Sequence, residues 1–147
     1  MSNKTALNAL PNDILQSMPE ALIVADLQGV IQRWNPGAEN VFGFTAAEAV
    51  GQSLDLIIPE RMRKAHWEGF NKAIERGGTL PGRTSAITRA IHKSGEPFYV
   101  DMSFAMVKDP AGKLIGSMAV ARDATKRFQE EKELRRQLAE LAPKAAS

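Results

Sequence analysis

Few side chains in this chain have chemistry of their own. The 147 residues include two histidines, His66 and His92, and no cysteine. Disulfides, thiolate nucleophiles, thiolate metal sites and cysteinyl adducts are therefore excluded together. The sequence contains no phosphate-binding glycine loop, no His-Glu-x-x-His motif and no set of nucleophile, base and acid. We therefore expect a protein that is not an enzyme.

His66 is the residue whose setting suggests a ligand. It lies in an apolar stripe of the segment 59–76, at helical spacing with Met62 and Phe70. Imidazole is the usual protein ligand of haem iron, and such a histidine must project from an apolar wall because a porphyrin needs a dry, flat slot. A histidine on an apolar helix face is also a common hydrogen-bonded core residue. His92 stands beside a predicted hairpin turn, where we expect it to be exposed and without a role.

The opposite wall of such a slot is predicted over residues 98–107. Apolar side chains stand there at every second position with polar ones between them, the pattern of a strand with one buried face. Met102 and Phe104 belong to the apolar side. We expect a pocket between this strand and the histidine helix. The candidate binding residues are His66, Met62, Phe70, Met102 and Phe104, with His66 as the candidate metal ligand.

The elements that position these walls follow from the rest of the pattern. Strands are expected over 21–26, 30–34, 85–92, 98–107 and 113–122. Helices are expected over 10–18, 38–42, 45–50, 59–76 and 123–142. Strands separated by one helical block indicate an α+β fold, with an antiparallel sheet and helices on one face.

The composition restricts the class of protein. Hydrophobic residues make up 44% of the chain, charged residues 24%, and the net charge is +2, as in globular domains. The charges are scattered, so we expect no nucleic-acid partner. No apolar run approaches the roughly 20 residues of a membrane span, and the N-terminus lacks a secretory signal. We expect a cytoplasmic protein with no membrane association.

Several short motifs occur in a fixed order between residues 18 and 125. They are Glu20-Ala-Leu-Ile-Val-Ala-Asp-Leu-Gln-Gly29, Trp34-Asn-Pro-Gly-Ala-Glu39, Phe42-Gly-Phe, Gly51-Gln-Ser-Leu, Ile57-Ile-Pro-Glu60, His92-Lys-Ser-Gly-Glu-Pro-Phe98 and Arg122-Asp-Ala-Thr125. Together they resemble the PAS family. The resemblance implies a five-stranded antiparallel sheet that cups a pocket against its helices. The expected parts are an N-terminal flanking helix at 1–19, a PAS core at 20–122 and a C-terminal signalling helix at 123–147.

One segment narrows the resemblance. Residues Pro59 to Phe70 are similar to the helix that supplies the proximal haem ligand in rhizobial oxygen-sensing kinases and bacterial oxygen-sensing phosphodiesterases. This implies a gas or redox sensor with haem iron bound by His66. In that interpretation Arg61, Arg63 and Lys64 pair with the haem propionates.

The gas-binding half of that pattern is missing. Ala86 stands where the kinases have an arginine that stabilises bound oxygen, and Thr84 stands where the phosphodiesterases have a methionine ligand. Met102 is either a sixth ligand or a core residue. Two alternatives to haem stay open: a small-molecule or empty pocket in a PAS signalling module, and flavin. Flavin photochemistry in the light-sensing subfamily needs a pocket cysteine, which this chain lacks.

The C-terminal helix suggests an assembly. Leu134, Leu138 and Leu141 have the spacing of a short coiled-coil seam. We expect this helix and the N-terminal helix to pair between two subunits of a homodimer. A signal would leave the sheet through Arg122-Asp-Ala-Thr125 for a partner domain that the sequence does not identify. Of the two tryptophans, Trp34 is expected in the core and Trp67 outside the pocket.

Overall fold

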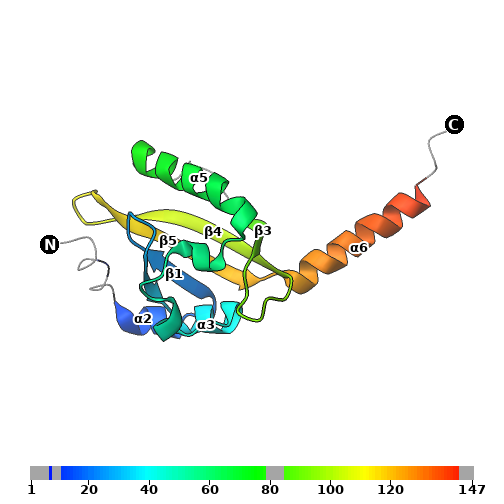
Figure 1. The fold of residues 1–147 in the computed structure, drawn as a ribbon, viewed down its shortest axis with the longest axis horizontal. Helices are drawn as coiled ribbons and strands as arrows, with labels where there is room; N and C mark the ends of the chain where they lie inside the picture. The colour runs from blue at the N-terminus through cyan, green and yellow to red at the C-terminus, as the bar shows by residue number, and fades with distance from the viewer. Residues whose placement is uncertain (1–6, 8–10, 79–84, 143–147) are drawn as a thin grey trace.

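A computed structural model describes residue 7 and residues 11–78 and 85–142. Five strands form one antiparallel sheet in the order β2-β1-β5-β4-β3, with helices packed against it (Figure 1). The predicted α+β fold with a five-stranded antiparallel sheet is confirmed. Thr84, the expected counterpart of a methionine ligand, lies outside the described residues.

The first half of the chain supplies two strands and the short helices. Its elements are α2 (Asn12–Ser17), β1 (Ala21–Ala25), β2 (Ile31–Trp34), α3 (Pro36–Phe42), α4 (Ala46–Ala49) and the 3₁₀ segments η1 (Leu54–Ile57) and η2 (Glu60–Met62). Thr45 and Glu48 form the predicted capping box at the N-terminus of α4. The 3₁₀ segment η1 was not predicted, because its four residues are too short for a helical period.

The second half supplies the long elements. They are α5 (Arg63–Arg76), β3 (Ala86–Ala90), β4 (Phe98–Lys108), β5 (Leu114–Asp123) and α6 (Thr125–Leu141). The helix predicted over 59–76 thus begins with a 3₁₀ turn, in which the Met62 amide donates to the carbonyl of Pro59 at 2.8 Å. α5 runs over one face of the sheet, and α6 projects away from it (Figure 1).

The main core lies on the face of the sheet that α5 covers. All five residues of β1 are buried, and Phe42 of α3 and Phe98 of β4 pack edge to face with ring centroids 5.6 Å apart. Trp34 is 4% exposed and donates its indole N–H to the carbonyl of Phe44 at 2.9 Å. The prediction that Trp34 packs in the core is confirmed.

The opposite face of the sheet carries a second, smaller core. Leu22 and Val24 of β1 and Ile115 of β5 pack there with Leu7, which is fully buried. A Cβ at Gly116 would lie 2.4 Å from the carbonyl oxygen of Ala25 and 3.0 Å from Leu7 Cδ1, so the glycine leaves room for both. Leu7 therefore packs on the sheet of its own chain, a contact that the sequence pattern did not indicate.

Asn35 joins three parts of the structure at the end of β2. Its side chain is 2% exposed, and Oδ1 accepts the backbone N–H groups of Leu22 and Ala38, each at 2.8 Å. The Nδ2 group donates to the carbonyls of Leu15 and Glu20 at 3.1 and 3.0 Å. One amide thus caps α3 and ties it to β1, to α2 and to the residue that precedes β1.

Replacing the Asn35 side chain should destabilise the fold. Asn35→Ala leaves buried N–H and C=O groups without partners, each worth about 1–3 kcal/mol, so we expect the free energy of unfolding to fall by about 3 kcal/mol. Asn71→Ala, at an exposed position of α5, should change it by less than about 0.5 kcal/mol. Urea titrations of both variants measure this difference, and equal losses would contradict the role given to Asn35.

Candidate functional site

Two adjoining cavities lie between α5 and the sheet. The first, of about 460 Å³, is walled by Ile23 of β1, Leu54 of η1 and Ala119 of β5. The second, of about 440 Å³, continues along α5 past Gly69 and Ala73. Each has the size of a small-molecule site, about 300–1,000 Å³. Together they form an elongated, mostly apolar slot.

The slot unites the predicted binding residues. Met62 lines the first cavity, Phe70 lines the second, and His66, Met102 and Phe104 line both. The Phe70 ring lies 6.0 Å from the imidazole and 6.4 Å from the Phe104 ring, measured between centroids. The helical spacing in α5 and the alternation in β4 therefore predicted correctly that these five side chains line one slot. Whether these residues bind a ligand stays a prediction.

His66 stands at the junction of the two cavities without a polar partner. Its Nδ1 is the one buried side-chain nitrogen or oxygen, among the described residues, that lacks a hydrogen bond. No hydrogen bond links its Nε2 to a described residue either, and Nε2 is not among the buried atoms. The imidazole is therefore not the hydrogen-bonded core histidine that the sequence left open. Its ring lines both cavities.

Burial also determines the protonation of this ring. Burial lowers the pKa of His66 below its ordinary value, and the nearby Asp55 carboxylate acts in the opposite direction with a smaller effect. The neutral imidazole is therefore the favoured form at neutral pH. Neutral imidazole is the form that binds a metal ion.

The sheet contributes two hydroxyl groups that the sequence did not single out. Thr88 of β3 lines both cavities, and Ser117 of β5, which is 2% exposed, lines the first. Thr88 pairs with Val100, so it points to the same face as the apolar residues of β4. The period-2 alternation of β3 and β5 was the signal that could have found them. Ala86 lines the second cavity.

Cationic side chains stand at the openings of the slot. Arg61 and Arg89 line the first cavity and also a surface groove of about 620 Å³. Arg76 lines the second cavity. Of the three cations expected near a bound haem, Arg61 alone reaches the slot. Arg63 donates instead to the carbonyls of Ile58 and Asp55 at 3.0 and 3.3 Å, and Lys64 is not a lining residue.

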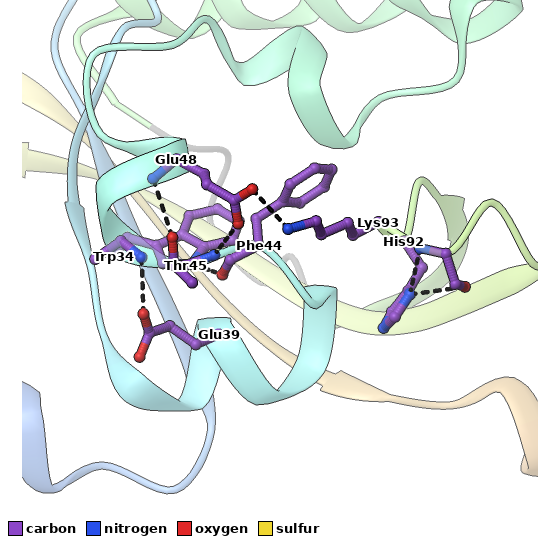
Figure 2. A network of polar contacts seen from close by, with 9 residues as sticks. Trp34, Glu39, Phe44, Thr45, Glu48, His92 and Lys93 are labelled. Carbon is purple, nitrogen blue, oxygen red and sulfur yellow. Dashed lines mark hydrogen bonds and ion pairs between the residues drawn. The ribbon is translucent and has the colours of Figure 1, made fainter.

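His92 is not the idle, exposed residue that the sequence suggested. It is half-buried, its ring lies edge to face with Phe98 at 5.2 Å, and a Cβ on Gly43 would come within 2.7 Å of its Cε1. The next residue, Lys93, forms an ion pair of 2.6 Å with Glu48 of the α4 cap (Figure 2). The expectation of an exposed His92 was wrong because the residues around Gly43, which are distant in sequence, pack against this turn.

The wall strand β4 also holds the C-terminal helix. Tyr99 stacks on Phe128 of α6 with ring centroids 3.8 Å apart, and Asp101 accepts from Arg127 at 3.2 Å. The hydrogen bonds of Asp101 with Ser85 and Arg127 lower its pKa. Tyr99 and Asp101 alternate along β4 with the residues that face the slot. β4 therefore contacts both the slot and α6.

Two kinds of site do not occur in the described part of the chain. No group of three or more His, Asp or Glu side chains there is arranged to hold a metal ion. None of the described helices has both the length and the apolar character of a membrane span.

Comparison with known proteins gives sequence relatives. A family model described as the PAS fold matches residues 9–124. The sensor protein FixL of Bradyrhizobium diazoefficiens is 42% identical over 53 residues, 36% of this chain and 10% of that protein. The oxygen sensor protein DosP of Escherichia coli is 27% identical over 120 residues, 82% of this chain and 15% of that protein. The chain thus matches a small part of the length of these relatives.

Solved structures give the same fold. The PAS domain of a protein from Colwellia psychrerythraea superposes with a TM-score of 0.67 at 23% identity, over 78% of this chain and 93% of that one. An RNA-binding light-oxygen-voltage receptor superposes with a TM-score of 0.69 at 22% identity, over 93% of this chain and 38% of that one. At these identities the likeness establishes the fold alone.

The lowered pKa of His66 predicts a pH effect on stability. The unfolded chain takes up the imidazole proton near the ordinary pKa of 6.5, whereas the folded chain takes it up at lower pH. Between these two values the unfolded state binds more protons, so the free energy of unfolding falls as the pH falls. We expect His66→Phe to lack this component. Urea titrations over that interval test this, and parallel stability curves for parent and variant would contradict it.

Proposed function

The chain belongs to the PAS family, and from that premise we propose that it is a sensory domain that holds haem in the slot beneath α5, with His66 Nε2 as the iron ligand. The observation that carries the proposal is an imidazole without a polar partner that faces an apolar slot. Neither ring nitrogen of His66 has a hydrogen bond to a described residue, and Nε2 is not among the buried atoms, so Nε2 is available to a ligand. When bound, haem supplies an iron centre that binds diatomic gases or changes redox state.

The residues around His66 fit such a group. Phe70 and Phe104 provide flat apolar surfaces, and Gly69 on α5 adds no side chain to the second cavity. A Cβ at Gly69 would meet no atom within 4 Å. Arg61 and Arg89 at one opening, and Arg76 at the other, are available to anionic substituents. The protein's part is to bind the group, orient it and exclude water.

Two residues are candidates for the side of the slot opposite His66. Met102 stands on β4, and a thioether is a known partner of histidine at haem iron. Thr88 on β3 places a hydroxyl among the apolar side chains. In the position of the kinases' arginine, Ala86 offers no hydrogen bond. Carbon monoxide or nitric oxide should therefore bind more durably than oxygen.

The relatives support a gas or redox signal over the alternatives. DosP, an oxygen sensor by name, is similar over 82% of this chain. The light-oxygen-voltage receptor shares the fold at 22% identity, and flavin photochemistry of that subfamily needs a cysteine that is absent here. A small-molecule or empty pocket is the alternative, and the addition of hemin distinguishes it from a haem site.

The signal would leave through β4 and α6, and we propose that α6 acts in a homodimer. Leu134, Leu138 and Leu141 are 58%, 66% and 80% exposed on that helix. Three leucines on one exposed stripe are costly in water and suit a second copy of the same helix.

Haem binding is tested by two histidine variants. The parent should turn red and develop a Soret band when hemin is added. His66→Ala should bind hemin more than about tenfold more weakly, because the iron ligand is removed. His92→Ala, whose ring packs on Phe98 outside the slot, should keep the parent spectrum. A parent protein that stays colourless after hemin is added would leave the small-molecule or empty pocket in place of haem.

Dimerisation is tested on the leucine stripe. Leu138→Lys should convert the dimer to monomer, because the charge would lie in the seam between the two helices. Gln137→Lys adds the same charge at the neighbouring exposed position and should leave the dimer intact. Multi-angle light scattering over a range of concentrations measures the mass. A parent chain that is monomeric at every concentration would refute the assembly.

A further inference from the structure

Trp67 is fixed in place beside His66. Its indole N–H donates to Asp55 Oδ1 at 2.8 Å, which ties α5 to η1. Its six-membered ring lies over Gly29, whose φ is +78° and where a Cβ would come within 2.1 Å of Trp67 Cη2. The turn after β1 therefore requires glycine and leaves the ring little freedom. Trp67 lines neither cavity of the slot, as the sequence predicted.

The indole is also the ring closest to the His66 imidazole. The two ring centroids are 4.6 Å apart and the ring planes are at 80°. Phe70, the other ring in contact with His66, is 6.0 Å away and tilted by 35°. Edge-to-face geometry directs the positive edge of one ring to the negative π face of the other. Neither ring nitrogen of His66 has a hydrogen bond to a described residue, and Nδ1 is the buried one of the two.

We propose that Trp67 is a positioning residue for His66: the indole face receives Nδ1–H and so holds the imidazole in the tautomer that leaves Nε2 unprotonated towards the slot. A neutral imidazole carries one N–H. Nδ1 is buried and has no hydrogen-bond acceptor, so within this proposal it is the atom on the imidazole edge that faces the indole, and an N–H there meets a negative π face, a recognised weak hydrogen bond. A proton on Nε2 would instead leave the Nδ1 lone pair facing that π face, which is repulsive. The inference concerns the protein alone and holds whichever ligand enters the slot.

His92 provides an internal comparison with the opposite tautomer. Its Nδ1 accepts the backbone N–H of Ser94 at 3.1 Å and lies 2.9 Å from the Ser94 hydroxyl. Because an accepting Nδ1 has no proton, the neutral ring of His92 must carry its proton on Nε2. The two histidines of the chain are thus expected to be Nδ1–H at His66 and Nε2–H at His92.

Long-range ¹H–¹⁵N correlation spectra of the ligand-free chain distinguish the two tautomers, because protonated and unprotonated ring nitrogens have different shifts. At about pH 8, above the ordinary imidazole pKa, the parent should show one histidine of each kind, assigned with His92→Gln. Finding Nε2–H at His66 in the parent would overturn the proposal.

Three variants separate positioning from packing. Trp67→Leu removes the π face and should give a mixture of tautomers at His66, while Trp67→Phe keeps an aromatic face and should retain Nδ1–H. Asp55→Asn keeps an acceptor for the indole and should also retain it. A folded Trp67→Leu protein that keeps pure Nδ1–H would overturn the role of the indole. Since no haem is present, these outcomes do not depend on whether haem binds.

Discussion

The alternation of side chains along β4 is the constraint on which the account depends. Neighbouring residues of a strand point to opposite faces, so Met102 and Phe104 face the slot while Tyr99 and Asp101 hold α6. One strand therefore carries both sets of contacts. In the proposed sensor, a ligand that displaces β4 would act on the slot and on α6 together.

The slot exists because α5 packs tightly at only part of its length. Phe70 and Ala73 are 3% exposed and join the core, whereas Met62 and His66 remain half-buried beside open volume. Small side chains on the sheet, such as Ala119, leave that volume unfilled. A core of larger residues would have closed it, as native packing density normally does. The site is thus a local departure from close packing, and it coincides with the partnerless imidazole.

The periodicity of the apolar residues predicted the fold and the five slot residues from the sequence. The capping box at Thr45 and the alternation of β4 are local patterns, and the features that they predicted are present in the structure. The features that the sequence did not predict depend on contacts between distant segments. Examples are the packing of His92 on Gly43 and the burial of Leu7 against Gly116, since in each pair the two residues are far apart in sequence and adjacent in the fold. Thr88 was missed because threonine is a common residue of β-strands, so its type alone does not mark it as a binding residue.

The central claim is that a ligand occupies the slot between α5 and the inner face of the sheet. Methionine methyl groups report on both faces: Met62 and Met102 line the slot, while Met18 and Met118 pack in the core of the opposite face. The most direct measurement is a methyl NMR spectrum of ¹³C-methionine-labelled protein as hemin is added. The account predicts that the Met62 and Met102 signals shift or broaden first and that those of Met18 and Met118 stay in place. Changes largest at Met18 and Met118, or equal at all four, would contradict it.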